Sequence, residues 1–166
     1  MSLTAQIKVL REKTGAPVIE CRNALVETGC DEEKATELLL KRGLARAEKK
    51  LHRLASMGMI EAYIHPGCRI GVLAEVNCES DFVARTQEFR ELAHDLALQI
   101  AATAPTFVSA QDMPEGNTAD PKEVCLLSQP FIKDPQKSVE ERIKETIARV
   151  GENIRVKRFA RFELGV

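Results

Sequence analysis

The sequence predicts an α+β protein, with a helical bundle at its N-terminus and a sheet covered by helices in its larger part. Residues 1–43 carry apolar side chains at helical spacing, with isolated glycines between the runs. After residue 57, three stretches alternate apolar and polar side chains as strands do, and helical patterns lie among them. One sheet with helices on one face is the economical packing for this order of elements.

Residues 1–43 predict three short amphipathic helices that form the first unit. Apolar residues recur at every third or fourth position in each of them. Pro17 suits the first turn of the second helix, and Asp31 suits the N-cap of the third. Each helix is expected to end at an isolated glycine, namely Gly15, Gly29 and Gly43. Such a bundle is similar to the ubiquitin-associated fold and has a thin core.

A basic segment over residues 44–56 is expected to be a helical linker. The basic residues in and just before it are Lys41, Arg42, Arg46, Lys49, Lys50 and Arg53. One interpretation is a solvated helix face that keeps the linker in solution, which is the usual meaning of such a run. The other interpretation is a contact with RNA or the ribosome.

Residues 57–166 are expected to form the core, an antiparallel sheet covered by helices. Strands are predicted over 59–65 and 69–78, joined by a turn that contains proline and glycine. A single long helix is predicted over 82–104, because its apolar residues recur at helical spacing until a proline follows.

The later part of the core adds one helix and one strand. Residues 109–122 are crowded with Pro, Gly, Asn and Asp, and so predict a loop. Ser138 and Glu141 form a capping-box pattern, which begins a helix that ends at Gly151. The final strand is predicted over 153–163. Its apolar face is expected to carry Ile154, Val156, Ala160 and Phe162, and its charged face Phe159.

Composition argues against several classes of function. The formal net charge of −1 argues against a surface devoted to nucleic acid. The five cysteines form no CxxC pair and the histidines have no zinc-binding spacing, so reduced thiols and no metal or cofactor are expected. Neither a glycine-rich phosphate loop nor a catalytic triad pattern is evident, so we do not expect an enzyme. No apolar run approaches membrane-spanning length, and a cytoplasmic protein is expected.

The stretch from Glu75 to Arg85 joins a predicted strand to a predicted helix, with an acid and an aromatic residue at the junction. Ser80 lies where a helix N-cap would be, and Asp81 falls in the first turn, where a negative charge suits the helix dipole. One interpretation is that Ser80 and Asp81 only cap the helix and that Phe82 belongs to the core. The alternative is that a rigid corner presents Phe82 to a partner protein.

Four blocks of the sequence, in order, resemble the elongation factor Ts family. Ser80-Asp81-Phe82-Val83 resembles that family's Thr-Asp-Phe-Val signature, with serine in place of threonine. The other blocks are Leu10 to Ala16, Gln129 to Pro135, and Gly151 to Ile154 with Arg158 to Gly165. A short motif alone would be weak evidence, but these blocks span nearly the whole chain.

The resemblance implies a guanine-nucleotide exchange factor for the GTPase elongation factor Tu. It implies that Asp81 and Phe82, flanked by Ser80 and Val83, enter the GTPase near its magnesium site. The phenyl ring would wedge between partner side chains and disturb the ion and the phosphate loop. The protein itself is then expected to bind no nucleotide, nucleic acid or membrane directly.

The resemblance also implies a second contact, between the N-terminal bundle and a helix of the GTPase. Its expected residues are Arg11, Val18, Ile19 and Arg22. Ile19 lies off the apolar stripe of its own helix, which suits an exposed anchor. Core packing of Val18 and a merely solvated surface for the two arginines are the alternatives.

Two further points remain open at the level of sequence. The family's helical pair between residues 108 and 125 is replaced here by the loop 109–122, and short members of the family can pair through their core sheets. A homodimer through the core sheet is therefore left open. The alternative function is an RNA- or ribosome-associated protein that uses the basic linker and the C-terminal strand.

Overall fold

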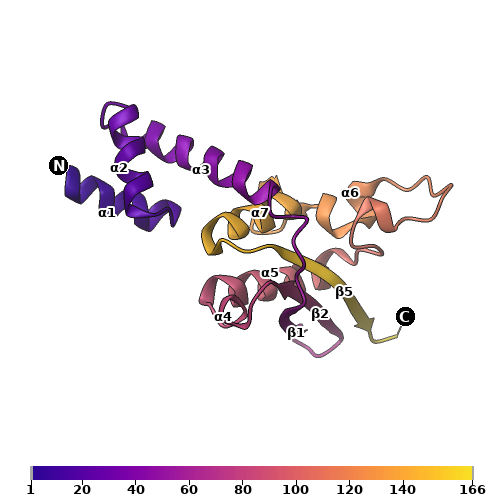
Figure 1. Ribbon diagram of the computed structural model, residues 1–166. Helices are drawn as coiled ribbons and strands as arrows, with labels where there is room; N and C mark the ends of the chain where they lie inside the picture. The colour runs from indigo at the N-terminus through magenta and orange to yellow at the C-terminus, as the bar shows by residue number, and fades with distance from the viewer. Residues whose placement is uncertain (1, 166) are drawn as a thin grey trace.

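A computed structural model describes residues 2–165 and consists of a helical head, a long third helix and an α+β core (Figure 1). The head lies at one end of the molecule, and the third helix carries the chain from the head to the core. The α+β class predicted from the sequence is confirmed. In this part of the chain, no helix has the length and apolar character needed to cross a membrane.

The head consists of α1 (Leu3–Thr14), α2 (Val18–Glu27) and the first half of α3 (Glu32–Glu48). As predicted, Gly15 ends α1 in the left-handed conformation, and Asp31 caps α3. The three helices enclose a small core of their own, made of Leu10, Ala16, Cys21, Ala24, Leu25, Ala35 and Leu39. The predicted three-helix bundle is confirmed.

The third helix does not end at Gly43, as the sequence predicted, but continues to Glu48. Gly43 is buried where α3 packs against α7 (Val139–Val150), and a Cβ added to it would lie 3.1 Å from the Ala148 Cβ. This glycine permits a close approach of two helices and does not stop one of them. The predicted helical linker over 44–56 is therefore helical only in its first residues, and turns follow before the first strand.

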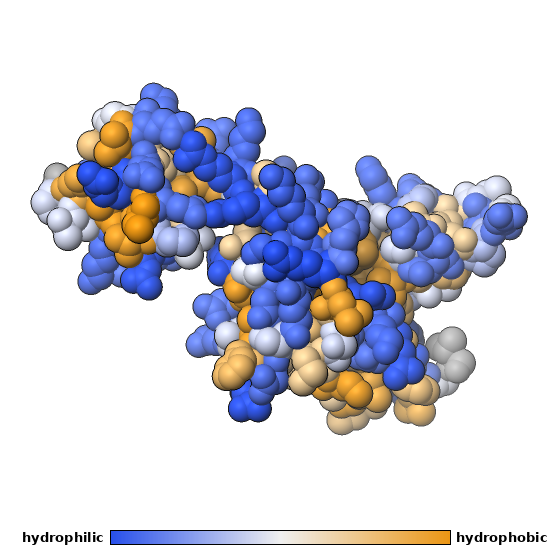
Figure 2. All heavy atoms as spheres, in the orientation of Figure 1, coloured by the Kyte–Doolittle hydropathy of each residue, from blue (hydrophilic) through white to orange (hydrophobic). Residues whose placement is uncertain are grey.

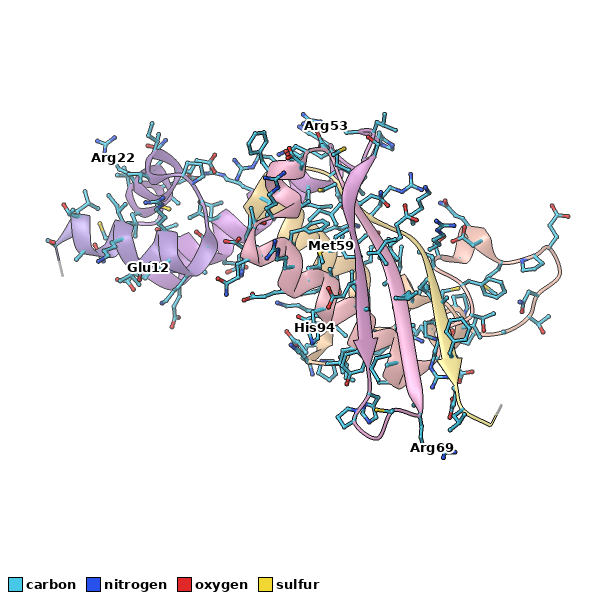
Figure 3. The ribbon with its side chains drawn as sticks, turned by 90° about the horizontal axis from the view of Figure 1, so that it is seen from below. Glu12, Arg22, Arg53, Met59, Arg69 and His94 are labelled. Carbon is cyan, nitrogen blue, oxygen red and sulfur yellow. The ribbon has the colours of Figure 1, made fainter. Side chains whose placement is uncertain are left out.

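The core sheet consists of β1 (Met57–Ile64), β2 (Ile70–Cys78) and β5 (Ile154–Glu163), in the order β1-β2-β5 and antiparallel throughout. The predicted hairpin is confirmed. On the central strand, alternate residues are buried under the helices, namely Val72, Ala74, Val76 and Cys78. In Figure 3 the sheet lies in front of the core helices, with its other face toward the viewer.

Two helices, α4 (Asp81–Ala84) and α5 (Gln87–Thr103), replace the single helix predicted over 82–104. The hydroxyl of Thr86 accepts a hydrogen bond from the Phe89 amide and caps α5 as a separate helix. Because α5 packs on the buried face of the sheet, α4 remains as a single turn at the corner between β2 and α5.

The helix predicted after Ser138 is confirmed as α7, with a capping box between Ser138 and Glu141 and a left-handed Gly151 at its end. The segment predicted as a loop is mostly irregular. It contains two short helical turns, η1 (Ala110–Asp112) and the start of α6 (Pro121–Val124). No sequence pattern predicted the elements that follow, which are η2 (Leu126–Ser128), β3 (Pro130–Phe131) and β4 (Asp134–Ser138).

The final strand contains a β-bulge. Glu75 lies opposite Arg158, and the next residue of β2, Val76, lies opposite Val156. Lys157 is therefore an extra residue in the ladder, and an extra residue reverses the alternation of side chains between the two faces.

The bulge overturns part of the predicted pattern of β5. Ile154 and Val156 are buried as predicted, but Phe159 packs against the core, and Ala160 and Phe162 face outward. The prediction that Ala160 and Phe162 share the buried face, with Phe159 on the charged one, is wrong. It assumed an uninterrupted period of two, which the bulge breaks.

Candidate partner-binding site

The corner between β2 and α4 presents a projecting tip, which we define as Ser80, Asp81, Phe82 and Val83. Phe82 is 79% exposed, whereas Val83 is 8% exposed and belongs to the core cluster. The interpretation that placed Phe82 in the core is therefore wrong. Val83 anchors the turn of helix, and the phenyl ring on the same turn points into solvent.

Asp81 lies in the first turn of α4 and pairs with Arg85, with 2.8 Å between Oδ2 and the guanidinium nitrogen. The Arg85 side chain is largely exposed, and that of Asp81 is partly exposed. A surface pair of this kind contributes between about 0 and 1 kcal/mol, so its loss in a complex costs little. Asp81 is thus available to a cationic or hydrogen-bonding group of a partner.

Ser80 fixes the corner through Glu152, a residue that no sequence pattern connects with it. Its hydroxyl donates to Glu152 Oε1 at 2.6 Å and its amide donates to Glu152 Oε2 at 2.9 Å. The predicted N-cap is present, but its bond is long, with 3.4 Å between the Val83 amide and Ser80 Oγ. Glu152 lies 72 positions away along the chain, and no local pattern connects it with Ser80.

A groove of about 910 Å³ begins at the tip, where Asp81 and Arg85 line it, and continues between β1 and α5. Inside it His94 makes a 3.0 Å hydrogen bond with Glu61, and its ring lies edge-on to Tyr63 with centroids 5.7 Å apart. His94 lies on α5 beside the edge of the sheet (Figure 3). The groove gives the tip a polar flank of mixed charge.

The head residues implied by the family resemblance are all exposed: Arg11, Val18, Ile19 and Arg22. Val18 is 51% exposed and Ile19 is 72% exposed, so the alternative of core packing for Val18 is wrong. Sequence reasoning missed Val26, which is 63% exposed. Its spacing of four from Arg22 and seven from Ile19 puts it on the same face of α2 and could have identified it. Apolar patches are visible over the head in Figure 2.

The head residues come from α1 and α2, whereas the tip comes from α4. A cleft of about 440 Å³ lies between the head and the core. It is lined by Lys8, Arg11, Glu12, Gly15, Glu88 and Arg149. Arg11 thus lines a space bounded on its far side by the first turn of α5.

Several residues of the basic linker region are engaged within the molecule. Arg42 pairs with Glu27 at 2.8 Å, and Arg46 pairs with Glu20. Lys50 donates a 2.5 Å hydrogen bond to the carbonyl oxygen of residue 151. These contacts hold α3 and the linker to the head and the core. They leave less positive charge for RNA phosphates than the sequence suggested.

Two neighbouring basic residues of the C-terminal strand are also paired. Lys157 and Arg158 both contact Glu75, at 3.2 Å and 2.7 Å. The hydrogen bond from Arg158, followed by that from Lys157, lowers the pKa of the Glu75 carboxyl. This arrangement weighs further against a strand that binds RNA.

Within residues 2–165, no group of three or more His, Cys, Asp or Glu side chains is arranged to hold a metal ion. All five cysteines are free thiols. Burial raises the pKa of the thiols of Cys21, Cys78 and Cys125, as expected for cysteines that act as small apolar residues.

Comparisons with known proteins all point to one protein family. The sequence model described as "Elongation factor TS" matches residues 32–124 and 118–166. The elongation factor Ts of Carboxydothermus hydrogenoformans is 46% identical over 195 positions, which cover 99% of this chain and 90% of the relative. Those of Moorella thermoacetica and Koribacter versatilis are 45% and 48% identical, with 99% and 97% of this chain covered and 96% and 87% of the relatives.

These matches define the chain as a translation elongation factor. It belongs to the elongation factor Ts family. The alignments also extend over more positions than the 166 residues of the chain, so the relatives contain residues that it lacks. The two matched segments of the family meet at 118–124, within and beside the short connection predicted as a loop.

Proposed function

We propose that this protein is a cytoplasmic guanine-nucleotide exchange factor, which binds elongation factor Tu with GDP and promotes release of the nucleotide. The observation that carries the proposal is the 79% exposure of Phe82 on a corner that Val83 and Ser80 hold in place. An aromatic side chain held on a rigid corner is a typical interface hot spot, because its burial in a partner supplies much of the binding energy.

The proposed mechanism requires no covalent step and no enzyme chemistry. Phe82 enters the GTPase beside its magnesium site, and Asp81 supplies a carboxylate at the same place. In such GTPases magnesium holds the β-phosphate of GDP, so displacing the ion weakens the hold on the nucleotide. Linkage then requires that bound nucleotide weaken the binding of the exchange factor by the same factor.

The head supplies affinity in this proposal. Ile19, Arg22 and Val26 form one exposed face of α2, with Val18 beside it. An apolar face with a central arginine has the composition of a protein-binding surface. Because the head and the tip lie on different elements, binding and release of nucleotide can be separated experimentally.

The test is the release of fluorescent GDP from elongation factor Tu, followed at increasing concentrations of this protein. A saturable acceleration that Phe82→Ala abolishes would support the proposal. No acceleration at concentrations where the two proteins form a complex would refute it. The salt dependence of binding to single-stranded RNA would identify the alternative, because phosphate contacts weaken steeply with salt.

We also propose that two copies associate through the uncovered face of the core sheet. This open face carries exposed apolar residues from all three strands, namely Ile60, Ala62, Ile64, Leu73, Ala160 and Phe162. Figure 2 shows apolar side chains gathered over the lower ends of these strands. Such a patch is larger than scattered surface residues would give, and a second copy offers a surface of the same kind.

A further inference from the structure

The turn that follows α7 touches both the tip and the linker, although these lie far away in the sequence. Its residues are Gly151, Glu152 and Asn153. Glu152 is the member that reaches the tip, and it does so with both carboxylate oxygens on Ser80. A carboxylate that accepts two hydrogen bonds from one residue fixes that residue in orientation as well as in position.

We propose that Glu152 is a positioning residue for nucleotide exchange, which holds the Phe82 tip in its projecting geometry by completing the N-terminal cap of α4. This inference rests on the exchange function proposed above. Glu152 acts through Ser80. The carboxylate of Asp81 pairs with Arg85, and the Phe82 ring is in solvent. Neither of these two partner-binding groups depends on a direct contact with Glu152.

The geometry is that of a capping box whose acid comes from elsewhere in the chain. In an ordinary capping box, the residue at N3 of the helix returns a carboxylate to the amide of the N-cap. In α4 that position is Val83, which has no polar group and is needed in the core. Glu152 supplies the missing acceptor. The complete local version exists in the same molecule, where Glu141 accepts from the Ser138 amide at 2.7 Å.

The tip needs this support because α4 has only four residues. A helix of one turn is not stable by itself, since nucleation costs more than its few hydrogen bonds return. Without an acceptor for the Ser80 amide, the corner would have an unsatisfied donor at the point where Phe82 must be held.

The turn is itself fixed from the other side. The Asn153 amide donates to Glu79 Oε1 at 2.6 Å, and the Asn153 side chain donates to the carbonyl oxygens of Leu51 and Arg53 at 3.2 Å and 2.7 Å. The turn therefore ties the tip to the linker that descends from the head. Glu152 therefore positions the tip relative to the linker, which also connects to the head.

The test compares Glu152→Ala, Glu152→Gln and the matched control Glu141→Ala in the full-length protein. The assay measures both the maximal rate of GDP release and the concentration that gives half of it. Glu152→Ala should lower the maximal rate about tenfold, since misplacement of a functional group by about 1 Å can cost that much or more, while the half-saturating concentration stays within about twofold. Glu152→Gln keeps an acceptor for the Ser80 amide and should retain most of the rate. Glu141→Ala removes an equivalent cap far from the tip and should leave the rate unchanged.

Hydrogen exchange of the Ser80 amide, measured by NMR on the isolated protein, separates the possible outcomes. Glu152→Ala should accelerate that exchange, and Glu141→Ala should not. Loss of GDP release with unchanged Ser80 protection would mean that Glu152 acts directly on the partner, which overturns a positioning role. A wild-type rate in Glu152→Ala would also overturn it. If the wild-type protein forms the complex but does not accelerate GDP release, the proposed exchange function is refuted. The role of Glu152 in exchange is then refuted as well, whatever the protection of the Ser80 amide.

Discussion

Gly15 at the end of α1 lies directly against Arg149 near the end of α7, where an added Cβ would come within 3.3 Å of the Arg149 Cγ. The neighbouring residue of α7, Ala148, makes the close contact with Gly43 of α3. Gly15 after α1 and Gly43 on α3 thus meet consecutive residues of one core helix. The head is held to the core by backbone proximity that any side chain would disturb.

Enlarging Gly43 should loosen this contact. Gly43→Leu should lower the free energy of unfolding by about 1–3 kcal/mol, because overpacking forces the two helices apart. Urea denaturation followed by circular dichroism measures the change. Ala45→Leu is the matched control, since Ala45 is exposed on the same helix. Equal stability of the two variants would show that α3 and α7 separate at no cost.

Truncation of Phe82 should affect exchange and not folding. Phe82→Ala should leave the free energy of unfolding within about 0.5 kcal/mol, since the ring is exposed. The stimulated rate of GDP release should fall at least tenfold, in line with a hot-spot cost of about 2 kcal/mol or more. Phe162→Ala removes another exposed ring, which lies on the open face and is 69% exposed, and should not change the rate of release. A large loss of stability in the Phe82 variant would argue that the ring supports the fold.

A charge on the exposed face of α2 should weaken binding without altering the maximal rate. Ile19→Asp should raise the half-saturating concentration about tenfold or more, because it buries a carboxylate in an apolar contact. The release assay reports both quantities. Leu40→Asp places the same charge on a partly exposed position of α3 in the same head and should have little effect. A lower maximal rate with unchanged half-saturation would assign Ile19 to the exchange step instead.

Self-association should depend on the open face. Sedimentation of the wild-type protein should show a dimer at micromolar concentration, and Ile60→Glu should give a monomer, since two copies would bury like charges. Leu54→Glu provides the control, because Leu54 lies in the linker and is 82% exposed. A monomeric wild-type protein across the concentration range would exclude this dimer.

Acid should weaken the cap of α7. Hydrogen bonds from the Ser138 amide and hydroxyl lower the pKa of Glu141 below its ordinary value of about 4.5. A lowered pKa contributes stability that is present above the ordinary value and is lost as pH falls through the folded-state value. The stability difference between the wild type and Glu141→Gln should therefore be constant above about pH 5.5 and shrink in more acidic solution. Urea titrations from pH 7 to pH 3 measure this stability difference, and Glu115→Gln is the exposed control. A stability difference that does not vary with pH would contradict the role of the Glu141 carboxylate in the cap.

Local sequence signals predicted most of the fold. The capping box at Ser138 and Glu141 and the strand alternation of the hairpin depend on neighbours in the chain, and both are confirmed. The errors concern tertiary contacts. Gly43 looked like a helix stop because its partner on α7 lies about a hundred residues later, and a single helix over 82–104 overlooked the cap at Thr86.

The candidate site was predictable only where it depends on neighbours in the chain. The tip was identifiable by its position between a strand and a helix, but the exposure of Phe82 was not, because a core phenylalanine fits the same pattern. The partnership of Ser80 with Glu152 could not be derived, since sequence separation of 72 positions leaves no periodic signal.

The extra residue at Lys157 gives β5 two phases of alternation, one before it and the opposite one after it. Deletion of Lys157 would leave a strand of uninterrupted alternation, in which Val156 and Phe159 still face inward and Ala160 and Phe162 still face outward. The bulge therefore absorbs one residue of strand length and keeps Ala160 and Phe162 on the open face. Two relatives that differ only in the presence of this residue would offer the same apolar surface to a second copy, one on a bulged strand and the other on a regular one.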